Sequence, residues 1–257
     1  MANRMSRVAK EEAERGKAIE KRGAIITLSN AVVNSAQCLT LSEKRLLMLA
    51  VSVVDPRVGK AEAHRIVSNI RAEDYAETFG TDKNTAYEQL KAAADHLYDR
   101  SVFSREIDQK GRPVMTKMRW IGRIKYHPGE GYVEMAFHYE IVPHLFELRR
   151  RFTSYHLAQA QALRSLYSWR LLEMIMQFKD SGWLQIDIEK FMDAMEATEK
   201  QRGDFNNVRR RMIEPAVKEL REKDGWILTW QPIKAGRKVK ALRFEFQQDK
   251  QERLPLG

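Results

Sequence analysis

The sequence of 257 residues contains a single cysteine, Cys38. One cysteine cannot form a disulfide within the chain, and it cannot supply the thiolates of a cysteine-based zinc site. Long apolar runs are also absent, because the longest, Leu46 to Val54, includes Ser52 and is far shorter than the roughly 20 residues that span a bilayer. The N-terminal segment alternates charges and has no signal-peptide pattern. We therefore expect a soluble, cytoplasmic protein in a reducing compartment.

The sequence also lacks the motifs of several enzyme classes. There is no G-x-x-x-x-G-K-[ST] loop for nucleotide phosphates and no nucleophile elbow. The six histidines are scattered and form neither a His-x-His nor a His-Glu-x-x-His metal pair. Two acid pairs, Asp187 with Glu189 and Asp193 with Glu196, are typical of solvated charges. We expect no catalytic residue, no metal and no cofactor, and hence a protein that is not an enzyme.

What the sequence does have is positive charge. Its 45 lysines and arginines outnumber its 35 acidic residues, which gives a formal charge of +10 and a pI of about 9.6. The hydrophobic content of 43% is enough for folded cores. This balance favours a polyanionic partner. An ordinary basic cytosolic protein is the alternative that net charge leaves open.

One segment near the C-terminus predicts a helix with an apolar side and a basic side. It begins at Asp204, a residue type that caps helices, and continues to Leu220. At 100° per residue, the apolar side carries Phe205, Val208, Met212, Ala216 and Leu220. The opposite side carries Asn207, Arg210, Arg211, Lys218 and Arg221. Arg209 falls on the apolar side, where it would either extend past the first turn to solvent or pair with a carboxylate beneath the helix. Pro215 removes a backbone donor, so we expect it to kink or reset the helix.

A hairpin without acidic residues is predicted shortly after that helix. The segment Gln231 to Phe244 turns at Ala235-Gly236 and carries Lys234, Arg237, Lys238, Lys240 and Arg243. In a winged-helix DNA-binding domain, a helix reads bases in the major groove and a hairpin holds phosphate. An ordinary amphipathic helix with a solvated basic side is the alternative, and the acid-free hairpin favours DNA.

The first half of the chain predicts a similar order of elements. Thr40 and Glu43 form a capping box at the start of an amphipathic helix. A short helix, Ala72 to Phe79, ends at Gly80, and Thr81 is expected to cap the next helix, which continues to about Tyr98. Strands are then expected at Ser101 to Ile107, at Val114 to Lys125 and at Tyr132 to Phe137. Asn84, Thr85, Glu88 and Lys91 are expected to face outward with Asp95 beside them, and Lys83 in the first turn is expected to reach a phosphate. The two acids make this a weaker DNA signal.

The second half repeats this order with a helix at Arg164 to Phe178, a strand at Leu184 to Ile188 and a short helix at Ile188 to Met195. The predicted fold class is therefore α+β, with two tandem winged-helix domains. We expect a charged N-terminal tail at 1–24, a first domain at 25–140, a second domain at 141–248 and a C-terminal tail at 249–257.

Several motifs, in this order, are similar to those of one known family. The segments that carry the similarity are Leu39–Leu47, Tyr75–Gly80, Phe137–Phe146 followed by Arg151–Leu157, Ser165–Glu173 and Arg209–Pro215. Together they resemble the replication initiator (Rep) proteins of iteron-containing theta-replicating plasmids, over nearly the whole stretch from Ile25 to Phe246. Asn206 and Asn207 stand where the family tends to have apolar residues or lysines, so the iteron sequence does not transfer.

This resemblance implies a plasmid replication initiator that takes part in plasmid copy control. Monomers would bind double-stranded DNA at origin repeats, the iterons, and dimers would repress the protein's own gene. The first domain would serve dimerisation and DNA contact, and the second would provide the principal iteron recognition. Implied partners are a second copy of the chain, the host replication initiator, the replicative helicase and chaperones.

Fourteen residues are the DNA-binding candidates: Lys83, Asn84, Thr85, Lys91, Asn206, Asn207, Arg209, Arg210, Arg211, Lys218, Lys234, Arg237, Lys238 and Lys240. A winged-helix transcriptional repressor without a replication role would have the same fold and contacts. A third alternative is an adaptor whose basic face binds acidic proteins or RNA.

Overall fold

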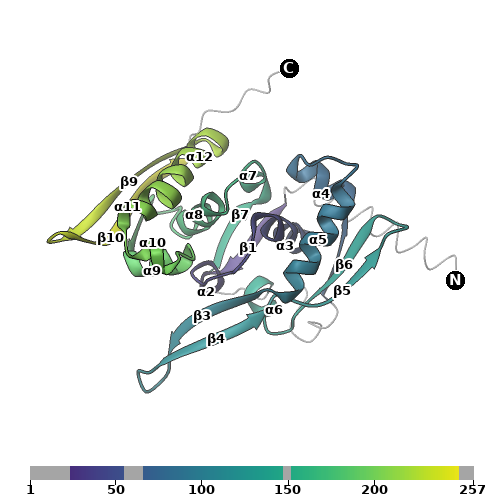
Figure 1. Ribbon diagram of the computed structural model, residues 1–257, viewed down its shortest axis with the longest axis horizontal. Helices are drawn as coiled ribbons and strands as arrows, with labels where there is room; N and C mark the ends of the chain where they lie inside the picture. The colour runs from purple at the N-terminus through teal and green to yellow at the C-terminus, as the bar shows by residue number, and fades with distance from the viewer. Residues whose placement is uncertain (1–23, 55–65, 147–151, 249–257) are drawn as a thin grey trace. The chain divides into compact units, whose positions relative to one another are not determined.

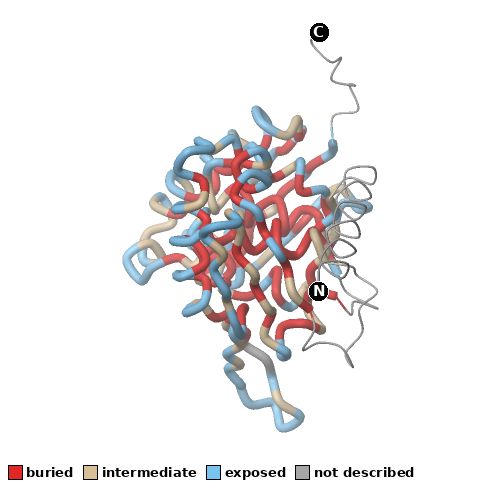
Figure 2. The backbone as a smooth tube through the Cα atoms, turned by 90° about the vertical axis from the view of Figure 1, so that its right-hand side faces the viewer, coloured by how far each residue is buried: buried red, intermediate tan, exposed pale blue. Residues whose placement is uncertain are grey.

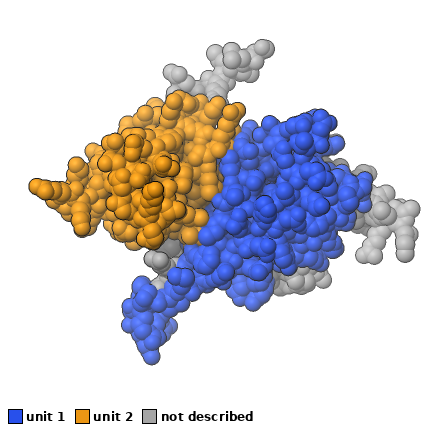
Figure 3. Space-filling view, viewed as in Figure 1, with its two compact units in different colours: residues 1–32, 37–161 blue, residues 33–36, 162–257 orange. Residues whose placement is uncertain are grey.

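The computed structural model describes residues 24–54, 66–146 and 152–248. The two expected tails, at 1–24 and 249–257, therefore lie outside the described residues apart from Ala24. By their contacts the described residues divide into two compact units, which Figure 3 colours separately. Unit 1 contains the residues up to Val32 and Gln37–Gln161, and unit 2 contains Val33–Ala36 and the residues from Ala162 onward.

Unit 1 begins its main helix as the capping box predicts. Helix α3 covers Leu41–Ser52, the Thr40 hydroxyl accepts from the Glu43 amide, and the Glu43 carboxylate accepts from the Thr40 amide at 2.8 Å. These two bonds satisfy amide donors that a helix start leaves unpaired. Leu46, Leu47 and Ala50 are fully buried, so the helix packs its apolar side into the core of the unit.

A helix-turn-helix follows α3. The strand β2 (Val67–Arg71) leads into α4 (Ala72–Phe79), which has the predicted bounds and ends at Gly80 with a φ of 63°. A left-handed φ is strained for residues other than glycine. The next helix, α5 (Ala86–Asp99), starts later than predicted, so Thr81 is not its cap. Residues 81–85 instead form a turn around Asp82, which accepts bonds from Asn84 and Thr85.

The predicted strand from Val114 to Lys125 is wrong, because two strands occupy this stretch. Strand β4 (Pro113–Arg119) pairs with β3 (Ser101–Ile107) as a separate hairpin, and β5 (Ile121–His127) pairs with β6 (Tyr132–Phe137). Trp120 separates them: its side chain is fully buried and donates to the carbonyl of Gln37 at 3.2 Å. The β3–β4 hairpin runs out beyond the helices of unit 1 in Figure 1.

Unit 1 also contains a small second sheet. Strand β1 (Ile25–Ser29) pairs with β7 (Phe152–His156). The short helices α2 (Asn30–Val33), α6 (Val142–Leu145) and α7 (Leu157–Gln161) follow these strands or precede them. Because β7 pairs with the first strand of the chain, contacts place the division between the units at Gln161/Ala162, later than the expected one at 140/141.

Unit 2 repeats the main elements of unit 1. Its elements in order are α8 (Leu166–Met176), β8 (Trp183–Asp187), α9 (Ile188–Ala194), α10 (Glu199–Arg202), α11 (Phe205–Val208), η2 (Arg209–Ile213), α12 (Glu214–Asp224), β9 (Trp226–Ala235) and β10 (Lys238–Gln248). The three segments α11, η2 and α12 follow one another without a break and form a single helix.

The sheets of the two units have the same topology. Their strand orders are β2-β6-β5 and β8-β10-β9, so in each sheet the first strand pairs with the last and the last two form a hairpin. A helix-turn-helix followed by such a hairpin is a winged helix. The prediction of two tandem winged-helix domains of class α+β is therefore confirmed. In unit 1 the wing is β5–β6, and the β3–β4 hairpin is an insertion before it.

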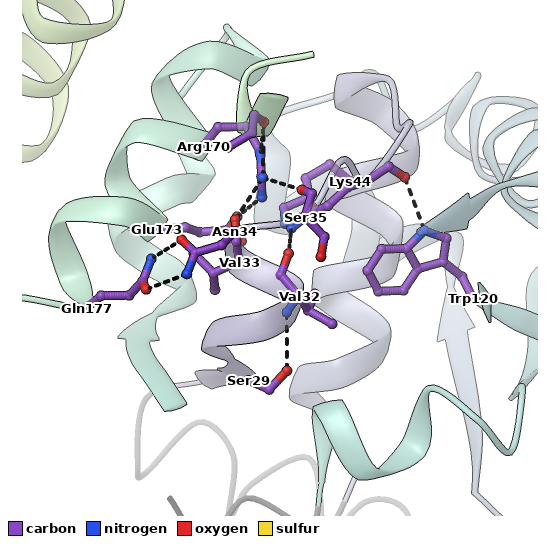
Figure 4. Close-up of polar contacts among 12 residues, drawn as sticks. Ser29, Val32, Val33, Asn34, Ser35, Lys44, Trp120, Arg170, Glu173 and Gln177 are labelled. Carbon is purple, nitrogen blue, oxygen red and sulfur yellow. Dashed lines mark hydrogen bonds and ion pairs between the residues drawn. The ribbon is translucent and has the colours of Figure 1, made fainter. Parts of the chain in front are cut away.

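Each unit buries its apolar side chains in a core of its own, and Figure 2 draws the buried stretches of the chain in red. Unit 2 also buries an ion pair: Arg170, 2% exposed in its side chain, contacts Glu173, which is 0% exposed, at 2.9 Å. The guanidinium of Arg170 donates to the carbonyls of Val33 at 2.8 Å and Ser35 at 2.7 Å (Figure 4). These bonds hold the segment Val33–Ala36 within unit 2.

Within the described residues, no helix has the length and apolar content needed to cross a membrane.

Candidate nucleic-acid interface

The start of the long helix of unit 2 is fixed at two points. Asp204 is its N-cap, and the side chain accepts from the Asn206 amide at 2.9 Å. The ring of Phe205 lies 6.5 Å from that of Trp230 in β9. This contact places the first turn of the helix beside the hairpin β9–β10. The two segments that the sequence marked as basic are therefore neighbours within one unit.

A wide turn interrupts the regular helix at Arg209–Ile213. The Glu214 amide donates to the carbonyl of Arg209, five residues back, where an α-helix would bond four residues back. Pro215 follows directly, so the reset expected at this proline takes the form of a π-turn. The turn presents an extra residue to the core, because Met212 and Ile213 are both fully buried.

The wide turn changes where the arginines lie. Arg209, expected on the apolar side with a carboxylate as one possible partner, does lie near one: its Nε is buried and is 3.5 Å from a carboxylate oxygen of Glu214, while the side chain as a whole is 43% exposed. Val208, which is fully buried, occupies the inward position. Arg210 is exposed and its Nε donates to the carbonyl of Asn206 at 3.4 Å. Arg211 is exposed and makes no side-chain bond to the described part of the chain.

The second half of the helix offers less free positive charge than predicted. Arg221 is exposed, as predicted, but its Nε donates to the carbonyl of Leu228 at 2.7 Å, so its guanidinium is already engaged within the unit. Lys218 is exposed and lies 3.8 Å from Glu222. Asn206 is exposed, whereas Asn207 is half-buried. The cationic and amide groups available to a ligand are thus concentrated at the start of the helix.

The hairpin β9–β10 carries the most accessible positive charge of unit 2. It turns at Gly236, which has a φ of 63°, and a bulge interrupts the pairing between Val239 and Ala241. Four exposed cations lie around this turn, and none of them contacts a carboxylate of the described residues: Lys234, Arg237, Lys238 and Lys240. Arg243 differs, since it stacks over Trp183 at 4.7 Å and pairs with Glu245 at 2.9 Å.

In unit 1, the corresponding region is helix α5 and the turn before it, where acidic residues already bind some of the polar side chains. Lys83, Asn84, Thr85 and Lys91 are all exposed, as predicted. However, Asp82 accepts from the amide and side chain of Asn84 and from the hydroxyl of Thr85. The ammonium of Lys91 lies 6.0 Å from the centre of the Tyr126 ring.

Tyr126 links this helix to the wing of unit 1. Its hydroxyl donates to a carboxylate oxygen of Asp95. Burial, followed by this bond and the negative charge of Asp95, raises the pKa of the Tyr126 phenol above the ordinary tyrosine range. The phenol therefore stays protonated and keeps Asp95 paired.

In the wing of unit 1, unlike that of unit 2, cations are paired with a carboxylate. Arg123 and Lys125 in β5 both contact the Glu134 carboxylate in β6, at 2.9 Å and 3.0 Å. A phosphate approaching this wing must compete with Glu134. The contrast between the two wings favours the expectation that the second domain supplies most of the affinity.

In each unit, one side-chain contact positions the helix beside the sheet strands, and neither contact could be predicted from the sequence. The contacts Phe205–Trp230 and Tyr126–Asp95 join residues that are distant along the chain, and no local pattern relates them.

Among the residues that the structure describes, no group of three or more His, Cys, Asp or Glu side chains could hold a metal ion.

The fold and this surface together define a class of protein, the tandem winged-helix DNA-binding proteins. Residues 25–176 match the family described as initiator replication protein, WH1, and residues 187–246 match the family described as initiator Rep protein, WH2. The chain therefore belongs to the replication initiator proteins. This membership favours an initiator over a repressor without a replication role, which the residues alone left open.

Individual relatives agree with this assignment. The chain is 26% identical to the PI protein of Escherichia coli over 244 residues, covering 83% of this chain and 79% of that protein. It is 23% identical to a replication initiation protein of Escherichia coli over 232 residues, covering 88% and 71%. A solved structure of the Pi initiator protein in complex with iteron DNA has a similar fold, with a TM-score of 0.73, 24% identity and coverage of 89% of this chain and 99% of that one.

Proposed function

We propose that this initiator binds duplex DNA at repeated origin sequences through the long helix and the wing of unit 2. The observation that carries the proposal is the set of exposed, uncompensated cations around the turn of β9–β10, beside a helix start that presents Asn206, Arg210 and Arg211. Phosphates attract such cations without regard to sequence, whereas arginine and asparagine recognise guanine and adenine edges. The related Pi protein was solved with iteron DNA, which supports this ligand.

In this proposal the helix start enters the major groove and the wing holds the flanking backbone. Unit 1 would place α5 on the same duplex, about 10 bp away, with weaker contacts because Asp82 and Glu134 occupy its polar and cationic groups. The protein would then cover about two turns of each repeat. Self-association with repression of its own gene, and contact with the host initiator, the replicative helicase and chaperones, remain predictions from the family resemblance.

The test replaces the exposed arginines one at a time. Arg210→Ala or Arg211→Ala should weaken binding to the preferred duplex by about 1–3 kcal/mol and relax the preference at one base pair. Binding to random duplex should change less, since the wing cations remain. The control is Lys179→Ala, which removes one exposed cation near Trp183 and Thr229 on the outer face of the sheet. Equal losses on preferred and random duplex for both arginine variants would contradict the assignment.

Replication itself is tested with a plasmid that carries only this gene, its upstream DNA and a selectable marker. Autonomous maintenance is expected, together with its loss in the Arg210→Ala variant. Competition of duplex DNA against RNA of the same length tests the remaining alternative, an adaptor whose basic face binds RNA. RNA binding in preference to duplex DNA would contradict the proposal.

A further inference from the structure

The wide turn Arg209–Ile213 decides which side chains of the long helix face outward. We propose that Pro215 and Arg209 together enforce this turn, and that the turn sets the register of the residues that read DNA. The inference rests on the proposed function, because it concerns the specificity of that same helix. Pro215 and Arg209 are positioning residues here, acting through the backbone on their neighbours.

Pro215 disfavours a regular helix at this place. In an unbroken α-helix, the amide of residue 215 would donate to the carbonyl of Arg211, and the proline ring would clash with that carbonyl. The bond from the Glu214 amide to the Arg209 carbonyl encloses one residue more than an α-turn and widens the helix before the proline. The flanking residues keep helical dihedrals, with φ and ψ of −57° and −48° at Val208 and −59° and −45° at Glu214, so the helix continues through the turn.

Arg209 disfavours the regular helix for a different reason. Without the extra residue, Arg209 would lie seven residues before Ala216 and eleven before Leu220, which places it within about 20° of both buried side chains. A guanidinium in that position would need a buried carboxylate partner. With the extra residue, Val208 takes the inward place, and the Arg209 side chain is 43% exposed with its buried Nε beside the Glu214 carboxylate.

The same offset, about 100° or one residue, applies to the outward side. Counting back from the exposed Lys218, a regular helix would align Asn207 and Arg211 with it. The wide turn aligns Asn206 and Arg210 in their place. The asparagines agree with this register, since Asn206 is exposed and Asn207 is half-buried, whereas Arg210 and Arg211 are both exposed. The Nε of Arg210 also donates to the backbone carbonyl of Asn206 at 3.4 Å. The turn therefore puts Asn206 in the outward place of Asn207 and brings Arg210 into line with Lys218, beside the exposed Arg211.

The test compares three variants of the full-length protein with the wild type, using selection from a pool of random duplexes. The variants are Pro215→Ala, the double variant Arg209→Leu with Pro215→Ala, and the control Pro143→Ala. Pro143 is another proline at a helix start, in α6 of unit 1, where no wide turn precedes it. Pro215 is exposed, so its replacement by alanine removes no buried contact.

We expect Pro143→Ala to select the wild-type motif. Pro215→Ala and the double variant should bind that motif about 5- to 140-fold more weakly, the loss of one base-reading pair, and should select a different motif. Their binding to random duplex and their melting temperature should not fall, which separates a change of register from unfolding. The double variant should show the larger effect, because leucine is tolerated on the buried side.

Selection of the wild-type motif with wild-type affinity by Pro215→Ala and by the double variant would overturn the inference. If the double variant does not fold, the result with Pro215→Ala decides alone. A crystal structure of either variant provides a check without DNA: a Glu214 amide still bonded to the Arg209 carbonyl would overturn the role of Pro215. A wild-type protein that selects no motif would refute the proposed function. A motif that the wild type and the variants share would refute only the role of the turn.

Discussion

The buried ion pair of unit 2 gives the most direct test of how this domain is held together. Arg170 and Glu173 stand one turn apart on α8, and both side chains are almost completely buried. The guanidinium also donates to the carbonyls of Val33 and Ser35 (Figure 4), and to that of Ala194 at 3.1 Å. One side chain thus satisfies a carboxylate and three carbonyls.

Replacing Arg170 by methionine, which is long and unbranched, should destabilise the protein by about 3–5 kcal/mol, because Glu173 is left as a buried charge without its partner. This is a large part of the roughly 5–15 kcal/mol that stabilises a domain. Adding Glu173→Leu removes the carboxylate that has lost its arginine. We expect the double variant to regain part of the loss, with an interaction energy of about 0.5–3 kcal/mol.

The assay is urea unfolding of the full chain, followed by tryptophan fluorescence, since four of the five tryptophans (Trp169, Trp183, Trp226 and Trp230) belong to unit 2. The matched control is Arg164→Met, an exposed arginine of the same unit, which should stay within about 0.5 kcal/mol of the wild type. A loss for Arg170→Met as small as that of the control would refute the reasoning. A double variant that is less stable than the single one would refute the role assigned to Glu173.

Two further predictions concern the wing and the alkaline range. Lys238→Ala should weaken binding to preferred and random duplex alike and reduce the slope of log affinity against log salt by about 0.9, and a loss confined to the preferred duplex would place Lys238 at a base. For Tyr126 the folded pKa is raised, so the stabilisation from its bond to Asp95 is present below about pH 10, the unfolded value, and is lost as the pH rises through the folded value. Tyr126→Phe should therefore flatten the alkaline part of the curve of stability against pH, and an unchanged alkaline slope would contradict this.

Local patterns predicted the elements whose causes are local. The bounds of α4 follow from helical spacing and from Gly80, whose left-handed φ ends the helix. The capping box at Thr40 and Glu43 is present because both of its bonds join residues three apart. The repeated order of helices and strands, and with it the fold class, could be predicted for the same reason.

Other features depend on contacts that no local pattern contains. The strand expected from Val114 to Lys125 is divided because Trp120 turns into the core and bonds to Gln37, far away along the chain. The pairing of Arg123 and Lys125 with Glu134 depends on the register of β5 against β6. A helical projection at constant angle could not place Arg209, since it assumes a regular turn where the structure has a wide one.

The sequence by itself determined two winged-helix units and a basic helix followed by an acid-free hairpin, because periodicity, caps and turns depend on residues close together along the chain. It also determined membership in a family of replication initiators. Only the tertiary structure decided which of the cations are free and which way the arginines point. Those properties depend on partners brought together by folding, such as Glu214 with Arg209 and Leu228 with Arg221, and on the one extra residue in a helical turn.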